Sequence, residues 1–106
     1  MPLGQPDALG VLAEPNRRKI LQSVWDDELS AGEIAGRFDV TFSAISQHLK
    51  ILRDAGLVVQ RKDGRRRLYS ANRRALGALG QLLEAYWQHQ LEALKPLAEQ
   101  EQRQRN

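Results

Sequence analysis

Residues 41–70 read TFSAISQHLKILRDAGLVVQRKDGRRRLYS, and this stretch joins two different hydrophobic periods. In its first half the apolar residues recur at the i, i+4, i+7 spacing of an amphipathic helix, at Ile45, Leu49 and Leu52. In its second half two strand-like runs, 57–62 and 65–70, flank Asp63-Gly64, a dipeptide typical of a tight β-hairpin. The stretch therefore predicts a helix over 42–55 followed by a hairpin.

Three shorter helical patterns precede this stretch. Leu9, Val11 and Leu12 indicate a short first helix, with Asp7 as its N-cap. Pro15 suits the first position of a second helix, which the apolar spacing extends to about Asp26. Ser30 and Glu33 have the spacing of a capping box and start a third helix over 31–37. This third helix and the helix over 42–55 are separated by a tight link, which predicts a helix-turn-helix.

A long helix is predicted after Asn72. Its broad apolar face is formed by Leu76, Leu79, Leu82, Leu83, Tyr86, Trp87, Leu91 and Leu94. We expect this helix to reach about Lys95 and to end or kink at Pro96. The fold class is thus mainly α with a β-hairpin wing, a winged helix-turn-helix of about five helices. One domain is expected over 1–96, with a polar, frayed tail over 97–106.

Positive charge is concentrated in one part of the chain. The net charge of the whole chain is +3, but residues 41–74 hold nine Lys or Arg against two Asp, a net charge of +7. This asymmetry favours a polyanionic partner such as nucleic acid. The chain has no cysteine, which excludes disulfides and thiolate metal sites. No apolar run is long enough for a membrane span, and residues 1–7 lack the features of a signal peptide, so a cytoplasmic protein is expected.

In a helix-turn-helix the second helix enters the major groove of DNA, and its N-terminal residues face the base edges. Once the apolar stripe of the helix over 42–55 is assigned to the core, the side chains left toward the groove are Phe42, Ser43, Ser46, Gln47 and Lys50, with Thr41 at the N-cap. Serine and glutamine exchange hydrogen bonds with base edges, and glutamine pairs best with adenine. The other interpretation is an ordinary solvated helix face.

The hairpin supplies a second set of candidate contacts. Its cations are Arg61, Lys62, Arg65, Arg66 and Arg67, and Arg73 and Arg74 follow. These side chains are expected to contact the DNA backbone or the minor groove. Arginines on an edge strand can instead serve only to prevent aggregation. For His48 the sequence leaves two roles open. The side chain either contacts a phosphate or has a structural role between the helix-turn-helix and the wing.

Several segments together resemble the ArsR/SmtB family of winged-helix repressors. They are LAEPNRRKIL at 12–21, SAISQHLKIL at 43–52, AGLV at 55–58 and DGR at 63–65. The resemblance covers about Leu9 to Leu94. It implies a homodimer, joined through the first and last helices, that binds an inverted repeat in its own or a neighbouring promoter. The dimer contacts implied are Leu9, Leu12, Leu79, Leu83, Tyr86, Trp87, Leu91 and Leu94.

The chain departs from the metal-sensing members of that family. Where some of them carry a Cys-x-Cys site, this chain has Glu33-Ile34-Ala35-Gly36-Arg37. Where others use paired histidines and acids on the last helix, it has only His89 with Glu84 and Glu92. The resemblance is therefore closest to the metal-independent, SdpR-like members, and no metal or other cofactor is expected.

Two other functions remain open from the sequence. In one, a metal or a small molecule, for example in a pocket lined by Tyr86 and Trp87, releases the DNA. In the other, the winged helix is a protein-interaction module without a nucleic-acid role. An enzyme is not expected, since the chain has no phosphate-binding glycine loop, no convergent pair of acids and no nucleophile beside a base.

Overall fold

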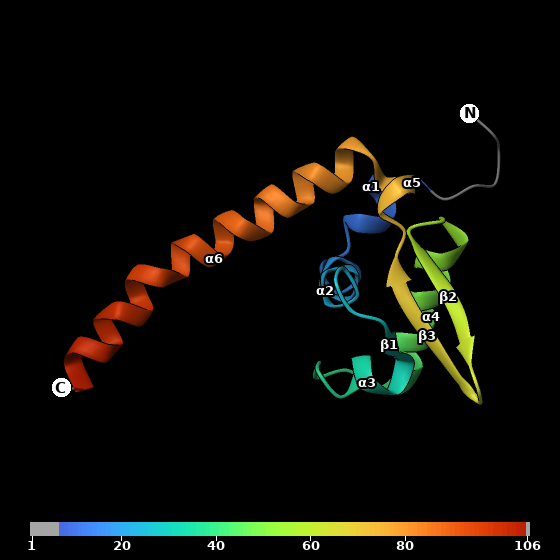
Figure 1. Ribbon diagram of the computed structural model, residues 1–106, viewed down its shortest axis with the longest axis horizontal. Coiled ribbons are helices and arrows are strands. Elements are labelled where there is room, and N and C mark those ends of the chain that lie inside the picture. The colour runs from blue at the N-terminus through green and yellow to red at the C-terminus, as the bar shows by residue number, and fades with distance from the viewer. Residues whose placement is uncertain (1–6, 106) are drawn as a thin grey trace. The chain divides into compact units, whose positions relative to one another are not determined.

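The computed structural model describes residues 7–105, and it describes side chains from 7 to 93 (Figure 1). Residues 1–6, which form most of the segment considered above for a signal peptide, lie outside the described part. The chain divides after Ala75 into two units. The first holds four helices and a small sheet in the arrangement of a winged helix-turn-helix, so the predicted fold class is confirmed.

The first two helices are α1 (Ala8–Leu12) and α2 (Pro15–Ser23). The Glu14 carboxylate caps α2 by accepting a hydrogen bond from the backbone N–H of Arg17 at 2.9 Å. In return, Arg17 and Arg18 of α2 donate to the carbonyls at the end of α1, at 2.6 Å to Val11 and 2.8 Å to Leu12. The predicted end of α2 at Asp26 was wrong, because the helix ends at Ser23 and Val24 leaves the helical conformation.

The helix-turn-helix consists of α3 (Ala31–Ala35) and α4 (Phe42–Asp54). The predicted capping box at Ser30 and Glu33 is present, with both hydrogen bonds at 3.1 Å. α3 stops at Ala35, two residues before the predicted end. α4 has nearly its predicted length, and it is the element that carries most of the candidate contacts.

Gly56 ends α4 as predicted. Its φ of +76° is in the left-handed region that glycine enters without strain. The N–H of Leu57 bonds to the carbonyl of Leu52 at 2.9 Å, and that of Gly56 to the carbonyl of Arg53 at 2.9 Å. These two bonds form a Schellman motif, which turns the chain from α4 directly into the sheet.

The sheet has three antiparallel strands in the order β1 (Leu29–Ser30), β3 (Arg66–Ala71) and β2 (Val58–Asp63). Strands β2 and β3 form the predicted hairpin, named the wing from here on, but each strand lies one residue later than predicted. The turn is Gly64-Arg65, since the positive φ of +63° belongs to Gly64 as the first turn residue. β1 was not predicted; it pairs Leu29 with Tyr69 and Ser30 with Leu68.

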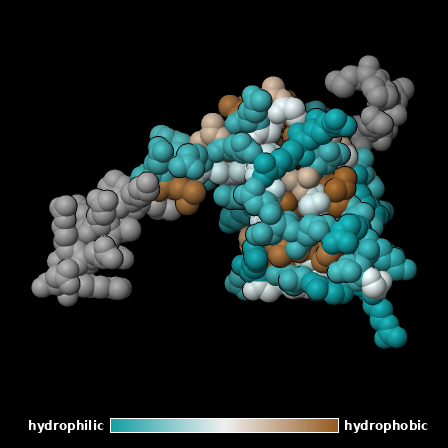
Figure 2. Space-filling model, viewed as in Figure 1, coloured by the Kyte–Doolittle hydropathy of each residue, from teal (hydrophilic) through white to brown (hydrophobic). Residues whose placement is uncertain are grey.

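The core of the first unit lies where α4 packs against α2, α3 and β2, and where α3 meets β1 and β3. The most deeply buried side chains there are Ile20, Leu21, Val24, Ile34, Ile45, Leu49, Leu52 and Val58, each at most 2% exposed. They include the whole apolar stripe predicted for α4. The wing projects from this core, and hydrophilic side chains cover its tip in the view of Figure 2.

After the sheet come α5 (Arg73–Leu76), at the division between the units, and α6 (Ala78–Arg105) in the second unit. The single long helix predicted here is interrupted at Gly77, whose φ is +53°. The predicted end of the helix near Lys95 was wrong, because α6 continues past Pro96. A proline removes one backbone hydrogen bond, and the surrounding alanine, leucine, glutamate and glutamine residues all favour helix.

Candidate nucleic-acid interface

The recognition face of α4 begins at its N-terminal cap. The Thr41 hydroxyl accepts a hydrogen bond from the backbone N–H of Ala44 at 3.1 Å, which holds the first turn of the helix. Opposite the buried stripe, the structure places the predicted contact residues Phe42, Ser43, Gln47 and Lys50 in exposed positions and Ser46 in a half-buried one. Phe42 is 59% exposed, so a large apolar side chain faces solvent beside this polar face.

His48 is turned away from this face. Its side chain is 18% exposed, and its Nδ1 lies 3.9 Å from the Glu14 carboxylate at the start of α2. Among the described residues, Nδ1 has no hydrogen-bond partner although it is buried. Burial raises the pKa of Glu14, but the N–H groups of Arg17 and Asn16, together with the charges of His48 and Arg17, lower it below the ordinary value overall. His48 of α4 therefore lies beside the start of α2, a neighbour that the sequence did not indicate.

The five predicted cations of the wing are all exposed. Two of them are ion-paired within the chain. Arg61 donates to both oxygens of Glu28 at 2.9 Å, and Arg66 donates to Glu33 of α3. Lys62, Arg65 and Arg67 form no ion pair within the described part of the chain.

These contacts shift the pKa values of the groups involved. The hydrogen bonds and the positive charge of Arg61 lower the pKa of Glu28, and Glu28 raises the pKa of Arg61. The pKa of Glu33 is lowered first by the backbone and side chain of Ser30 and then by Arg66. Both carboxylates are therefore ionised at neutral pH and oppose two of the positive charges of the wing.

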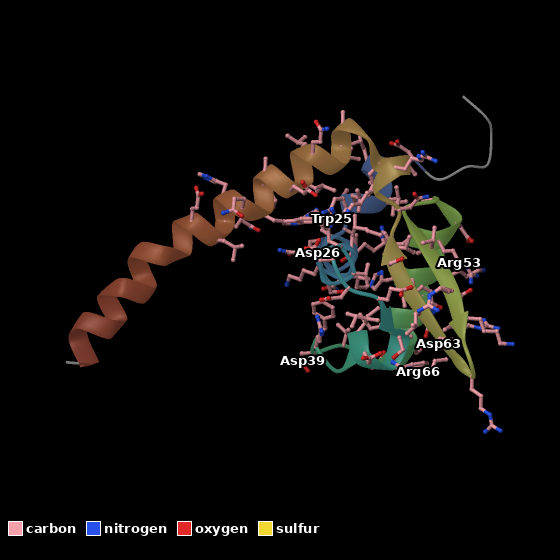
Figure 3. The ribbon with its side chains drawn as sticks, viewed as in Figure 1. Trp25, Asp26, Asp39, Arg53, Asp63 and Arg66 are labelled. Carbon is pink, nitrogen blue, oxygen red and sulfur yellow. The ribbon has the colours of Figure 1, made fainter. Side chains whose placement is uncertain are left out.

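A contact that sequence reasoning missed links α4 to the wing. Arg53 donates to the side-chain oxygen of Gln60 at 3.0 Å, and the Gln60 amide donates to the hydroxyl of Tyr69 at 2.9 Å. Figure 3 shows Arg53 nearer the base of the wing, and Asp63 and Arg66 nearer its tip. The pairing of Gln60 with Tyr69 follows from the hairpin register, but the reach of Arg53 does not.

Arg73 has a structural role at the base of the sheet. Its guanidinium lies 4.9 Å from the ring centroid of Trp25, and it donates to the Trp25 carbonyl at 2.8 Å and to the Asp26 carboxylate. Such a stacked arginine combines a cation–π contact with hydrogen bonds. Arg73 and Arg74 are both exposed, but Arg73 is held by these contacts, whereas Arg74 forms no ion pair in the described part of the chain.

The predicted dimer residues fall into two groups by exposure. Leu12, Leu83 and Trp87 are each 6–8% exposed in the single chain, and Leu79 is half-buried. Leu9, Tyr86 and Leu91 are exposed, as is Leu82, which was predicted only for the apolar face of the helix. The side chain of Leu94 lies outside the described residues.

Between residues 7 and 93, no three His, Asp or Glu side chains gather closely enough to hold a metal ion. Within the described helices, none has both the length and the apolar character needed to cross a membrane.

Comparison with known proteins agrees with this geometry. Residues 14–59, which contain the helix-turn-helix and the start of the wing, match the model of the bacterial regulatory protein, arsR family. The HTH-type transcriptional regulator Rv2034 of Mycobacterium tuberculosis is 37% identical over 97 residues, which cover 91% of each chain. The chain belongs to the ArsR family. The transcriptional activator HlyU of Vibrio cholerae is 39% identical over 75 residues, covering 71% of this chain and 69% of HlyU.

The ArsR fold extends beyond the helix-turn-helix. The crystal structure of a possible transcriptional regulator for arsenical resistance matches with a TM-score of 0.66 and 41% identity, over 86% of this chain and 95% of that one. As an ArsR-family protein, the chain is a transcriptional regulator that binds DNA through a winged helix-turn-helix.

Proposed function

We propose that this ArsR-family protein is a homodimeric repressor that reads an inverted repeat in its own or a neighbouring promoter. In this proposal α4 lies in the major groove, and the wing contacts the backbone or the minor groove. The observation that carries it is the division of α4 into a buried apolar stripe and an exposed polar face, next to a cationic hairpin.

The polar face supports base reading by its position and its chemistry. Ser43 and Gln47 are exposed in the first half of α4, which is the part that meets base edges in this motif. Glutamine forms a bidentate pair with adenine, and each such pair discriminates against a wrong base by about 1–3 kcal/mol. Phe42 has the apolar surface to contact a thymine methyl group.

Dimerisation is supported by the apolar residues that the single chain leaves exposed. Leu82, Tyr86 and Leu91 of α6 are 48–66% exposed, and Leu9 of α1 is 66% exposed. Apolar side chains at helical spacing on a long helix are typical of a subunit interface. A two-fold symmetric dimer reads half-sites about one helical turn apart, so an inverted repeat is the operator expected.

We further propose that the protein belongs to the metal-independent, SdpR-like members of the family and acts in the cytoplasm. The scarcity of metal-ligating side chains supports metal independence, since the chain has no cysteine and only two histidines, His48 and His89. Titration with zinc in a calorimeter should give no binding heat. A stoichiometric heat would place the protein among the metal-responsive members instead.

The direct test of DNA reading is fluorescence anisotropy on the DNA upstream of the gene and on a scrambled duplex. We expect a specificity ratio of about a thousandfold or more and an affinity that falls steeply with salt. Gln47→Ala should lower the ratio about tenfold or more and keep the salt dependence. Gln22→Ala is the matched control, since Gln22 is exposed on α2, outside the proposed interface.

Regulation in the opposite direction is favoured by one observation, the similarity to an activator of Vibrio cholerae. A reporter gene placed behind the upstream DNA distinguishes repression from activation. Deletion of the regulator should raise the expression of the reporter if the protein represses and lower it if the protein activates.

A further inference from the structure

The register of the wing divides its charged side chains between two faces. Residues directly opposite each other in an antiparallel pair share a face, and successive residues alternate. Arg61, Asp63 and Arg66 therefore lie on one face, named the paired face, because Asp63 is opposite Arg66 and Arg61 is two residues from Asp63. Lys62 and Arg67 are opposite each other on the other face, named the open face.

Acids oppose the cations of the paired face, and two of these acids come from outside the hairpin. Glu28, directly before β1, holds Arg61 with two hydrogen bonds of 2.9 Å, and Glu33 of α3 holds Arg66. Asp63 lies on this face as well, and its charge acts on Arg61. Two arginines are thus opposed by three carboxylates.

The open face carries cations without such partners. Within the described part of the chain, neither Lys62 nor Arg67 has an ion pair, and both are exposed. This face is also the one that α4 reaches, because Gln60 and Tyr69 lie on it and Arg53 of α4 bonds to Gln60. The unpaired charges of Lys62 and Arg67 are therefore on the same side of the wing as the C-terminal part of α4.

We propose that Glu28 and Glu33 are specificity-determining residues of the wing, which neutralise Arg61 and Arg66 and so confine its phosphate contacts to the open face and the turn. This inference rests on the proposed function, since it concerns how the same surface binds DNA. Each cation that reaches a phosphate strengthens binding to any DNA sequence. When two of the five cations of the wing are neutralised in this way, the affinity for DNA of any sequence falls, and base reading by α4 is unchanged.

The test removes the acids without removing the fold. Exposed ion pairs contribute little to folding, and Glu33→Gln keeps the capping box because glutamine also serves at that position. The matched control is Asp27→Asn, which makes the same change in charge beside Glu28 at a residue with no ion pair in the described part of the chain. Affinity for the scrambled duplex is measured at several salt concentrations for each full-length variant.

Each freed arginine that reaches a phosphate steepens the slope of log affinity against log salt by about 0.9. Glu28→Gln and Glu33→Gln should each show this change and bind the scrambled duplex several-fold more tightly at low salt, while Asp27→Asn stays near wild type. Adding Arg61→Gln to Glu28→Gln should restore the wild-type slope. Lys62→Gln and Arg67→Gln should make the slope shallower by a similar amount.

The possible failures are distinguishable. If the wild type prefers the upstream DNA but Glu28→Gln and Glu33→Gln behave like Asp27→Asn, the inference is wrong and the proposed function stands. If they bind DNA more weakly, the acids brace the arginines for DNA contact, which also overturns the inference. If the wild type prefers no sequence and the variants still gain affinity for the scrambled duplex, Glu28 and Glu33 neutralise the two arginines as inferred, but the proposed operator reading is wrong, and with it their role in specificity.

Discussion

The turn that ends α4 gives a prediction whose size can be worked out from the backbone. Gly56 has a φ of +76°, and a methyl group added to it would meet no atom within 4 Å. Gly56→Ala therefore introduces no clash, and its whole effect comes from the backbone. A residue with a Cβ in the left-handed conformation costs about 1–2 kcal/mol.

Part of this cost is offset in the unfolded chain, where alanine is less free than glycine by about 0.4–1 kcal/mol. The expected net loss in the free energy of unfolding is thus about 1 kcal/mol. For a domain of this size that corresponds to a fall in the melting temperature of roughly 5 °C. Gly56→Asn should lose less, because asparagine enters the left-handed region more readily.

The assay is thermal unfolding followed by circular dichroism, at one fixed protein concentration because dimerisation would add to apparent stability. Gly10→Ala is the internal control. Gly10 lies within α1, and a Cβ there would make only ordinary contacts at 3.9 Å with Asp7. The same chemical change should therefore raise stability at Gly10, by about 0.5–1 kcal/mol, and lower it at Gly56.

The reasoning would be refuted if Gly56→Ala melted at or above the wild-type temperature while Gly10→Ala gained stability. The residue after α4 would then not be left-handed, and the Schellman motif that directs the chain into the wing would be wrong.

Three further predictions follow from the same structure. Thr41→Ala should cost about 1 kcal/mol in urea unfolding by removing the hydrogen bond to the Ala44 N–H, and Thr41→Ser should keep most of it. The pKa of Glu14 is lowered in the folded state, so the ionised carboxylate stabilises the fold above its ordinary pKa of 4.5, and this contribution is lost as the pH falls through the lowered pKa. The free energy of unfolding, measured with urea from pH 3 to 6, should therefore depend less on pH for Glu14→Gln than for wild type. Equal pH dependences would contradict this. Leu49→Ala should cost about 2–5 kcal/mol, since Leu49 is 1% exposed, and a loss below 1 kcal/mol would mean that the side chain is not in the core.

Much of the first unit could be predicted from local sequence. The stripe of Ile45, Leu49 and Leu52 and the capping box at Ser30 are patterns of a few residues that form where expected, and the glycine turn of the wing forms one residue later. The two-residue strand β1 could not be found, because alternation needs several residues to be visible. Gly77 lies within an apolar helical pattern, and nothing local distinguishes a tolerated glycine from one that interrupts the helix.

The candidate site was predicted less completely than the fold. The exposed residues of α4 followed from subtracting its core stripe, and this needed only the helical period. The partners of Arg61 and Arg66 lie 33 residues away in the sequence, and that of His48 is the N-cap residue of another helix. Contacts of this kind depend on how the elements pack, so a single sequence shows the cations of the wing but not which of them are already paired.

The pairing of β1 with β3 also has a consequence for the order in which the chain folds. Leu29 meets Tyr69 across some forty residues of sequence, whereas β2 and β3 are joined by two residues. Local hairpins close within microseconds, and contacts between distant residues form more slowly because a long loop must close first. During synthesis, α3 and α4 are complete before the strand that anchors β1 has been made. The short β1 then remains an unpaired edge until Tyr69 has emerged, and at two residues it offers little for another chain to pair with.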